Sequence, residues 1–184
     1  MKEIINLKEK YRTVAVPAMD KIFDYGNNLA VPKIKKAVLN VGIGKFSKED
    51  AKVSEIENSL AEITGQKAVK TRARKAIAGF KIRQGQEVGI TVTLRKGRMW
   101  DFIGRLVNTT LPRIRDFQGI EPKAIDSGGN LNIGIKEHIV FPEIVPEKVK
   151  NLFGLQITIV TDARKKEEAK ELFKLLGFPI KDAN

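Results

Sequence analysis

The order of hydrophobic and polar residues predicts both strands and helices in this chain. Several segments alternate with a period of two, which is typical of a β-strand that buries one face. The clearest is EVGITVTLR, in which every second residue from Val88 is apolar. The predicted strands are 35–43, 66–71, 80–83, 87–95, 131–135 and 154–161.

Hydrophobic residues three or four positions apart predict helices, and two of these helices meet a proline. The first helix begins at Asn6, whose side chain can cap it, and we expect Pro17 to bend or break it. A second amphipathic helix covers 99–111, and we expect Pro112 to close it. Both ends follow from the missing N–H of proline.

Two more helices are predicted from the residues at their ends. An N-cap side chain accepts a hydrogen bond from the first turn, and a glycine after the last turn stops the helix. The end signals are Ser47, Asp50 and Gly65 for the helix around 53–63, and Asp162 or Thr161 with Gly177 for the final helix.

Helices and strands are mixed along 184 residues, with no low-complexity linker and no internal repeat. This pattern predicts one α+β domain over residues 1–184. Each predicted strand has one apolar face, which helices must cover. We expect the opposite face of the sheet to stay open.

The open face carries short hydrogen-bonding groups and glycines instead of the usual mixture of Lys and Glu. Such a flat, neutral face suits close approach to ribose and phosphate groups, although an ordinary hydrated sheet face is the alternative. It has no aromatic residue on which bases could stack. Its members are Asn40, Gly42, Gly89, Thr91, Thr93, Arg95, Asn130, Asn132, Gly134, Gln156 and Thr158.

Charge strengthens the case for a polyanionic partner. The formal net charge is +12, and residues 67–98 hold ten cations against the single carboxylate of Glu87. A solvated face normally interleaves both signs, and the cluster lacks the apolar stripe of a membrane-surface helix. Nucleic acid is therefore favoured over a membrane surface. Within this stretch, residues 72–79 have neither helical nor strand period, so we expect a mobile basic loop, in the form of a long hairpin excursion that ends in the strand at 80–83.

The sequence offers little for catalysis. It has no Cys and only one His, His138, so thiolate or multi-histidine metal sites and cysteine nucleophiles are excluded. The VGIGK segment at 41–45 lacks the spacing of a phosphate-binding loop. There is no membrane-length apolar run, so we expect a soluble, intracellular binding protein without enzymatic activity, cofactor or metal.

Residues 65–120 strongly resemble the universal large-subunit ribosomal protein family that binds 5S rRNA, in its bacterial-length form. Flanking segments extend the resemblance over nearly the whole chain. The segments that carry it are GQKAVKTRARKAIAGFKIRQG (65–85), VTLR (92–95), MWDF (99–102), LPRIRDFQG (111–119), LNVGIG (39–44) and GIKEHIVFPEI (134–144).

The resemblance implies a mostly antiparallel sheet with helices on one face, in a cytoplasmic ribosomal protein. It implies that the open face and its rim bind 5S rRNA, alongside other large-subunit rRNA. It also implies that a basic loop reaches the peptidyl-site tRNA and that the same side meets a protein of the small-subunit head. On this chain the expected 5S rRNA contacts are Asn40, Gln66, Thr91, Thr93 and Arg95, and the expected tRNA contacts are Arg72, Arg74 and Lys75.

A few positions depart from the family pattern. Lys96 stands where Gly is frequent after VTLR, and His138 stands where Gln is usual. Gln118 replaces a frequent basic residue, and Leu131 replaces a common aromatic one. Two rival functions remain open: a general RNA chaperone, which would bind many RNAs alike, and a nucleotide-dependent enzyme, which would hold phosphate at residues 42–45.

Overall fold

The structure, a computed structural model, describes residues 6–46 and 49–181. Five strands form one antiparallel sheet in the order β2-β3-β1-β5-β4, and helices accompany it, so the predicted α+β class is confirmed. The strands are β1 (Ile34–Gly42), β2 (Val69–Arg72), β3 (Glu87–Leu94), β4 (Leu131–Ile135) and β5 (Leu155–Thr161). The helices are α1 (Leu7–Lys10), α2 (Val16–Phe23), α3 (Asp50–Thr64), α4 (Lys96–Arg105), α5 (Leu111–Arg113) and α6 (Lys166–Leu176).

The chain divides into two compact units. Unit 1 consists of residues 1–37, 95–133 and 158–184, and unit 2 consists of residues 38–94 and 134–157. Unit 2 holds the β2–β3 hairpin and α3, whereas unit 1 holds the other five α-helices.

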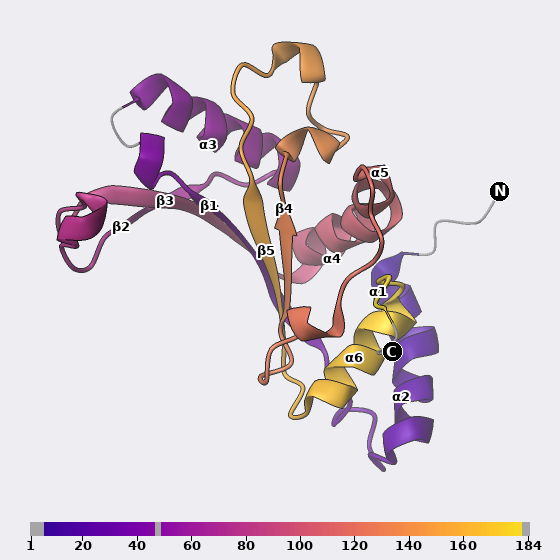
Figure 1. Ribbon diagram of the computed structural model, residues 1–184. Helices are drawn as coiled ribbons and strands as arrows, with labels where there is room; N and C mark the ends of the chain where they lie inside the picture. The colour runs from indigo at the N-terminus through magenta and orange to yellow at the C-terminus, as the bar shows by residue number, and fades with distance from the viewer. Residues whose placement is uncertain (1–5, 47–48, 182–184) are drawn as a thin grey trace. The chain divides into compact units, whose positions relative to one another are not determined.

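In unit 2, α3 packs against β3 (Figure 1). Alternation along β3 puts Ile90, Val92 and Leu94 in the core, each at most 1% exposed, and leaves the intervening threonines half-buried. Gly65 ends α3 with a left-handed φ of 65°, as predicted. The other helix signal, Ser47, lies outside the described residues, and Glu49 holds the N-cap position.

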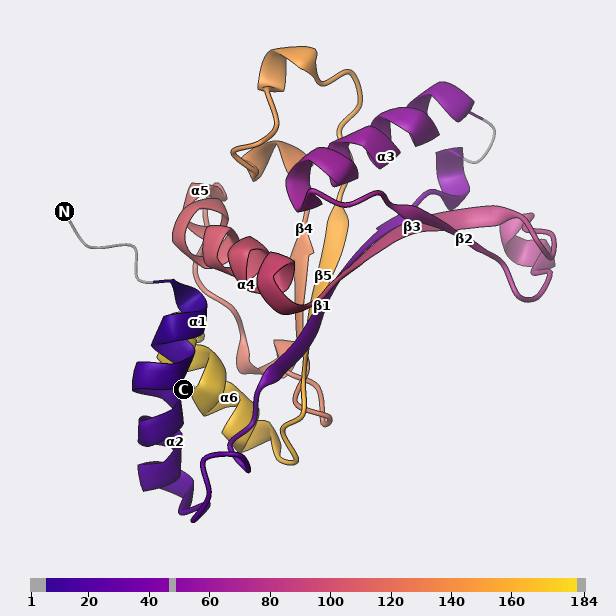
Figure 2. The ribbon, with the colours of Figure 1, turned by 180° about the vertical axis from the view of Figure 1, so that it is seen from behind.

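In unit 1, α2 packs beside α6 (Figure 2). The amphipathic face of α6 buries its apolar side chains, and Gly177 ends it with a φ of 100°. Asn6 caps α1, as predicted, by accepting a hydrogen bond from the Lys8 N–H at 3.0 Å. Buried residues of this unit include Met19, Phe102, Ile103, Leu106, Ala169, Leu172, Phe173 and Leu176.

Neither proline breaks its helix. The first helix continues past Pro17 to Phe23, so the expected break is wrong there, whereas the other helix continues past Pro112 only to Arg113, one residue beyond the expected end. A π-helical turn at Tyr11–Ala15 precedes Pro17, and another at Leu106–Thr110 precedes Pro112. In a π-turn each N–H bonds the carbonyl five residues back instead of four. The turn therefore shifts the hydrogen-bond register just before the proline, which has no N–H to donate. Each helix therefore continues through its proline.

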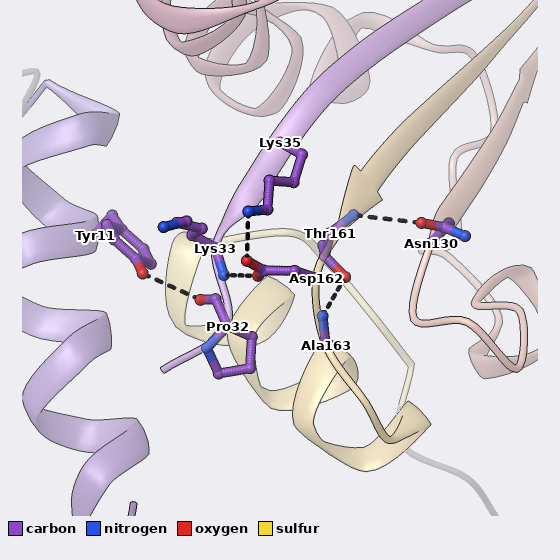
Figure 3. Close-up of polar contacts among 8 residues, drawn as sticks. All are labelled: Tyr11, Pro32, Lys33, Lys35, Asn130, Thr161, Asp162 and Ala163. Atoms are coloured by element: carbon purple, nitrogen blue, oxygen red, sulfur yellow. Dashed lines mark hydrogen bonds and ion pairs between the residues drawn. The ribbon is translucent and has the colours of Figure 1, made fainter. Parts of the chain in front are cut away.

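The expected caps of the last helix were also wrong. Helix α6 begins after Lys165, and Asp162 instead accepts the Lys33 N–H at 2.6 Å and pairs with the Lys35 ammonium at 2.9 Å (Figure 3). Thr161 donates to the Gly129 carbonyl at 2.7 Å. Both side chains therefore fasten strand ends within unit 1 and are not free to cap a helix.

Candidate nucleic-acid interface

Four of the predicted 5S rRNA contacts lie in unit 2, on or beside the polar side of β1 and β3. Asn40 is exposed on β1, and Thr91 and Thr93 are half-buried on β3. Gln66, which follows α3, donates its side-chain amide to the Thr93 carbonyl at 3.3 Å. The structure thus brings Gln66 and Thr93 together, although they are far apart in the sequence. We call Asn40, Gln66, Thr91 and Thr93 the polar face of unit 2.

Part of the hydrogen-bonding capacity of this face is already used. Thr91 donates its hydroxyl to the Leu39 carbonyl at 2.9 Å, so its oxygen remains available mainly as an acceptor. The side chain of Asn40 makes no hydrogen bond to any described residue, and neither do Gln66 Oε1 and the Thr93 hydroxyl. The polar face therefore offers both donors and acceptors to an external partner.

Gly89 lies between these polar side chains, and its backbone is buried. A Cβ atom built on Gly89 would lie 2.6 Å from the hydroxyl oxygen of Thr71 and 3.6 Å from Asn40 Oδ1. Thr71 pairs directly with Gly89 across β2 and β3. It therefore belongs to the same face, although it is not among the predicted contacts, because the sequence pattern does not reveal the register of β2.

Arg95 is the fifth predicted 5S rRNA contact and the first residue of its segment of unit 1. It follows β3 with extended backbone angles of −140° and 165° and precedes α4. Its side chain is exposed and makes no ion pair with any described residue. The guanidinium is therefore available for a phosphate.

The predicted tRNA contacts lie on the β2–β3 hairpin. Arg72, Arg74 and Lys75 are all exposed, and none has an ion-pair partner in the described part of the chain. Only Lys70, lower on the hairpin, is partly neutralised, by Glu87 at 3.4 Å. The hairpin therefore carries an uncompensated positive charge, as the composition predicts.

The expected hairpin excursion is present, and backbone hydrogen bonds continue along it almost to the tip. The Ala73 N–H donates to the Gln86 carbonyl at 2.8 Å, and the Gly85 N–H donates to the Ala73 carbonyl at 2.9 Å. Ile77 and Ile82 form an isolated antiparallel bridge. The expected strand at 80–83 is wrong, because Phe80 ends a 3₁₀ turn (Ala78–Phe80) that closes the tip. These backbone bonds form without any period in the side chains.

Unit 1 has two hydrogen-bonded pairs of polar residues on or beside its strands. Thr158 donates to Asn132 Oδ1 at 2.7 Å, and Asn130 accepts the Thr161 N–H at 3.3 Å (Figure 3). Both asparagines were expected on the open face. Their hydrogen bonds link neighbouring strands, so they have structural partners.

Other chemistry finds no support among the described residues. No group of three His, Asp or Glu side chains could hold a metal there, and no described helix is long and apolar enough to cross a membrane. His138 is fully buried and stacks on Phe153, with ring centroids 3.8 Å apart. Burial lowers the pKa of His138, which suits a neutral core side chain.

A hollow of about 570 Å³ in unit 2 lies between α3 and residues 143–151. Glu55 closes part of it by accepting the Lys150 N–H at 2.9 Å and the Asn151 side chain at 2.6 Å. The hydrogen bond from Asn151 lowers the pKa of Glu55. This carboxylate therefore holds a loop in place and is not poised for proton transfer.

Comparison with known proteins identifies the family. Residues 27–83 match the family model described as ribosomal protein L5, and residues 87–180 match the model for the C-terminus of the same family. The large ribosomal subunit protein uL5 of Halothermothrix orenii is 53% identical over 174 residues, covering 95% of this chain and 97% of that protein. The uL5 proteins of Thermotoga maritima and Roseiflexus sp. are 46% and 49% identical, with similar coverage. The chain therefore belongs to the ribosomal protein L5 family, and like its members it is a structural, non-enzymatic component of the large ribosomal subunit in the cytoplasm.

Proposed function

We propose that the whole chain acts as one RNA-binding domain that binds 5S rRNA through the polar face of unit 2 and through Arg95. The domain also contacts other rRNA of the large subunit beside 5S rRNA. Asn40, Gln66, Thr91 and Thr93 supply neutral hydrogen bonds to ribose hydroxyls, and Arg95 supplies a charge-assisted bond to a phosphate.

The observation that carries this proposal is the uncommitted hydrogen-bonding capacity of the polar face. Asn40 is exposed, its amide makes no hydrogen bond to a described residue, and Thr91 keeps an acceptor oxygen beside it on the next strand. Ribose 2′-hydroxyls both donate and accept, so a face with mixed capacity matches them better than a row of charges would.

The basic hairpin has a second role in this proposal. Arg72, Arg74 and Lys75 contact phosphates of the peptidyl-site tRNA, and the same side of the protein meets a protein of the small-subunit head. The exposure of the three cations and their lack of carboxylate partners among the described residues support this assignment.

A filter-binding titration with 5S rRNA tests the first part. We expect Arg95→Ala to weaken binding by about 1.5–3 kcal/mol, because a buried charge-assisted hydrogen bond to phosphate would be lost. Arg12→Ala is the matched control, since Arg12 is also an exposed cation, on the first helix of unit 1. Equal losses in the two variants would contradict a specific role for Arg95.

Replacing Arg72, Arg74 and Lys75 together by Ala tests the division of labour. We expect 5S rRNA affinity to survive and tRNA retention on ribosomes to fall. If the triple variant lost 5S rRNA binding instead, the hairpin would belong to the 5S rRNA site and our assignment would be wrong.

A general RNA chaperone is the competing function, because it would be equally basic. Competition with a scrambled RNA of the same length as 5S rRNA separates the two. A chaperone would bind both RNAs with similar affinity, whereas our proposal requires a clear preference for 5S rRNA at the same salt concentration.

A further inference from the structure

The tip of the basic hairpin presents a large aromatic side chain to solvent. Phe80 is 76% exposed, and Ile77, beside it on the tip, is 48% exposed. Exposing a phenylalanine ring to water is unfavourable in the free protein, so its exposure indicates that the ring contacts a partner.

The backbone holds this side chain in a defined place. The Ile82 and Ile77 N–H groups bond each other's carbonyls at 3.2 and 2.9 Å, which closes a short loop. Within it, the Phe80 N–H bonds the Ile77 carbonyl at 3.2 Å. Lys81 then takes a left-handed φ of 53°. Phe80 therefore lies at the apex of a hydrogen-bonded turn.

The charges around the tip select the kind of partner. A second protein surface would normally need acidic residues to match this hairpin, whereas a nucleic acid brings phosphates together with aromatic bases. The cations without ion-pair partners among the described residues of the hairpin are Arg72, Arg74, Lys75, Lys81 and Arg83.

Gly79, next to Phe80, has room for a side chain. No described atom lies within 4 Å of a Cβ built at Gly79, and its φ is not in the left-handed region. Neither turn geometry nor internal packing requires glycine there. A small residue beside an exposed ring fits a tip that lies closely against another surface.

We infer that Phe80 stacks on an unpaired nucleobase of the tRNA that the hairpin contacts, with Arg74 and Lys75 binding the adjacent phosphates. This inference rests on the proposed role of the hairpin and adds a base contact to it. Stacking needs only the π-face of the ring, so it supplies affinity that tolerates different base identities.

Release of labelled tRNA from the peptidyl site of ribosomes that carry each variant tests the inference. Stacking on one base is worth roughly 5- to 150-fold in affinity, so Phe80→Leu should speed release within that range. Phe80→Trp keeps an aromatic face and should release tRNA no faster than the wild type. Unchanged release from Phe80→Leu ribosomes would overturn the inference.

Salt dependence separates stacking from charge. Phe80→Leu should lower the tRNA affinity without changing the slope of log affinity against log KCl concentration, whereas Lys75→Ala should reduce the magnitude of that slope by about 0.7–0.9. A Phe80→Leu variant that instead weakened subunit association with tRNA release unchanged would identify a protein partner and overturn the inference.

The triple variant of Arg72, Arg74 and Lys75 distinguishes the two possible failures. If it releases tRNA quickly and Phe80→Leu does not, the hairpin role stands and the stacking is wrong. If the triple variant also retains tRNA like the wild type, the proposed role of the hairpin fails, and the stacking inference fails with it.

Discussion

Thr71 occupies the space that a side chain on Gly89 would need. The two residues pair across β2 and β3, and a Cβ on Gly89 would come within 2.6 Å of Thr71 Oγ1. The φ of Gly89 is not left-handed, so the requirement for glycine is one of space and not of backbone conformation. The Thr71 hydroxyl and Asn40 Oδ1 both lie within 4 Å of the position that this Cβ would take.

Gly89→Ala should lower the free energy of unfolding by about 1–3 kcal/mol, because the new methyl group overpacks a buried position. Urea denaturation measures the loss. Thr71→Ala deletes the clashing oxygen, so the double variant should recover most of the stability lost in Gly89→Ala. Additive losses in the double variant would show that the contact with the Val41 carbonyl, at 3.4 Å, limits the site instead.

Lys96→Gly should stabilise the protein by about 0.5–1 kcal/mol. Lys96 has a φ of 54°, which costs an L-residue roughly 1–2 kcal/mol and costs glycine almost nothing. The greater freedom of glycine in the unfolded chain offsets part of this gain. Thermal unfolding measures the difference.

Lys96→Ala is the control for that measurement, since it removes the same charge but keeps a Cβ. If Lys96→Ala stabilised the protein as much as Lys96→Gly, charge repulsion in the basic cluster would be the cause and not the left-handed backbone.

The sequence predicted the strands of the core because burial enforces alternation. Strand β3 shows this best, as its even-numbered apolar residues from Ile90 onward are all buried. The tip of the hairpin could not be predicted in the same way. The conformation of the tip is fixed by backbone hydrogen bonds such as those between Ile77 and Ile82. These bonds do not require any regular pattern of apolar side chains, so the sequence does not reveal them.

The site was predicted in part for a related reason. Asn40, Thr91 and Thr93 follow from strand alternation, so their common face could be read from the sequence. Thr71 could not, because its place depends on the register of β2 against β3, and that register shifts between Thr71 and Arg72. A one-residue shift moves a side chain to the other face.

Stability should fall as the pH drops below about 6.5, and His138 should cause the fall. Burial lowers the pKa of His138 in the folded protein, so the unfolded chain takes up a proton first. The contribution is present above the unfolded pKa of about 6.5 and is lost below it, at up to ~1.4 kcal/mol per pH unit. Urea denaturation across this range measures the slope.

His138→Gln should flatten the slope just below pH 6.5, because glutamine does not titrate. The carboxylates with lowered pKa values, Glu55 and Asp126, destabilise the protein only at lower pH and do not interfere. An unchanged slope in His138→Gln would assign the pH dependence to another group.

Asp162 allows the backbone and ionic parts of one interaction to be separated. One carboxylate oxygen accepts the Lys33 N–H at 2.6 Å, and the other pairs with Lys35 at 2.9 Å (Figure 3). Asp162→Asn keeps an acceptor for Lys33 but loses the ion pair, so it should cost at most ~1 kcal/mol, as half-exposed pairs do. Asp162→Ala loses both and should cost about 1–2 kcal/mol.

Unfolding at high salt concentration tests whether the ion pair with Lys35 and the hydrogen bond to Lys33 contribute separately. In 1 M NaCl the ion pair is screened, so the difference between Asp162→Asn and the wild type should nearly vanish. The larger loss in Asp162→Ala should persist, because a hydrogen bond between a backbone N–H and a short side chain is screened little. If the two variants were equally unstable in low salt and equally restored in high salt, the Lys35 pair would account for the whole contribution of the Asp162 side chain, and its bond to the Lys33 N–H would contribute nothing measurable.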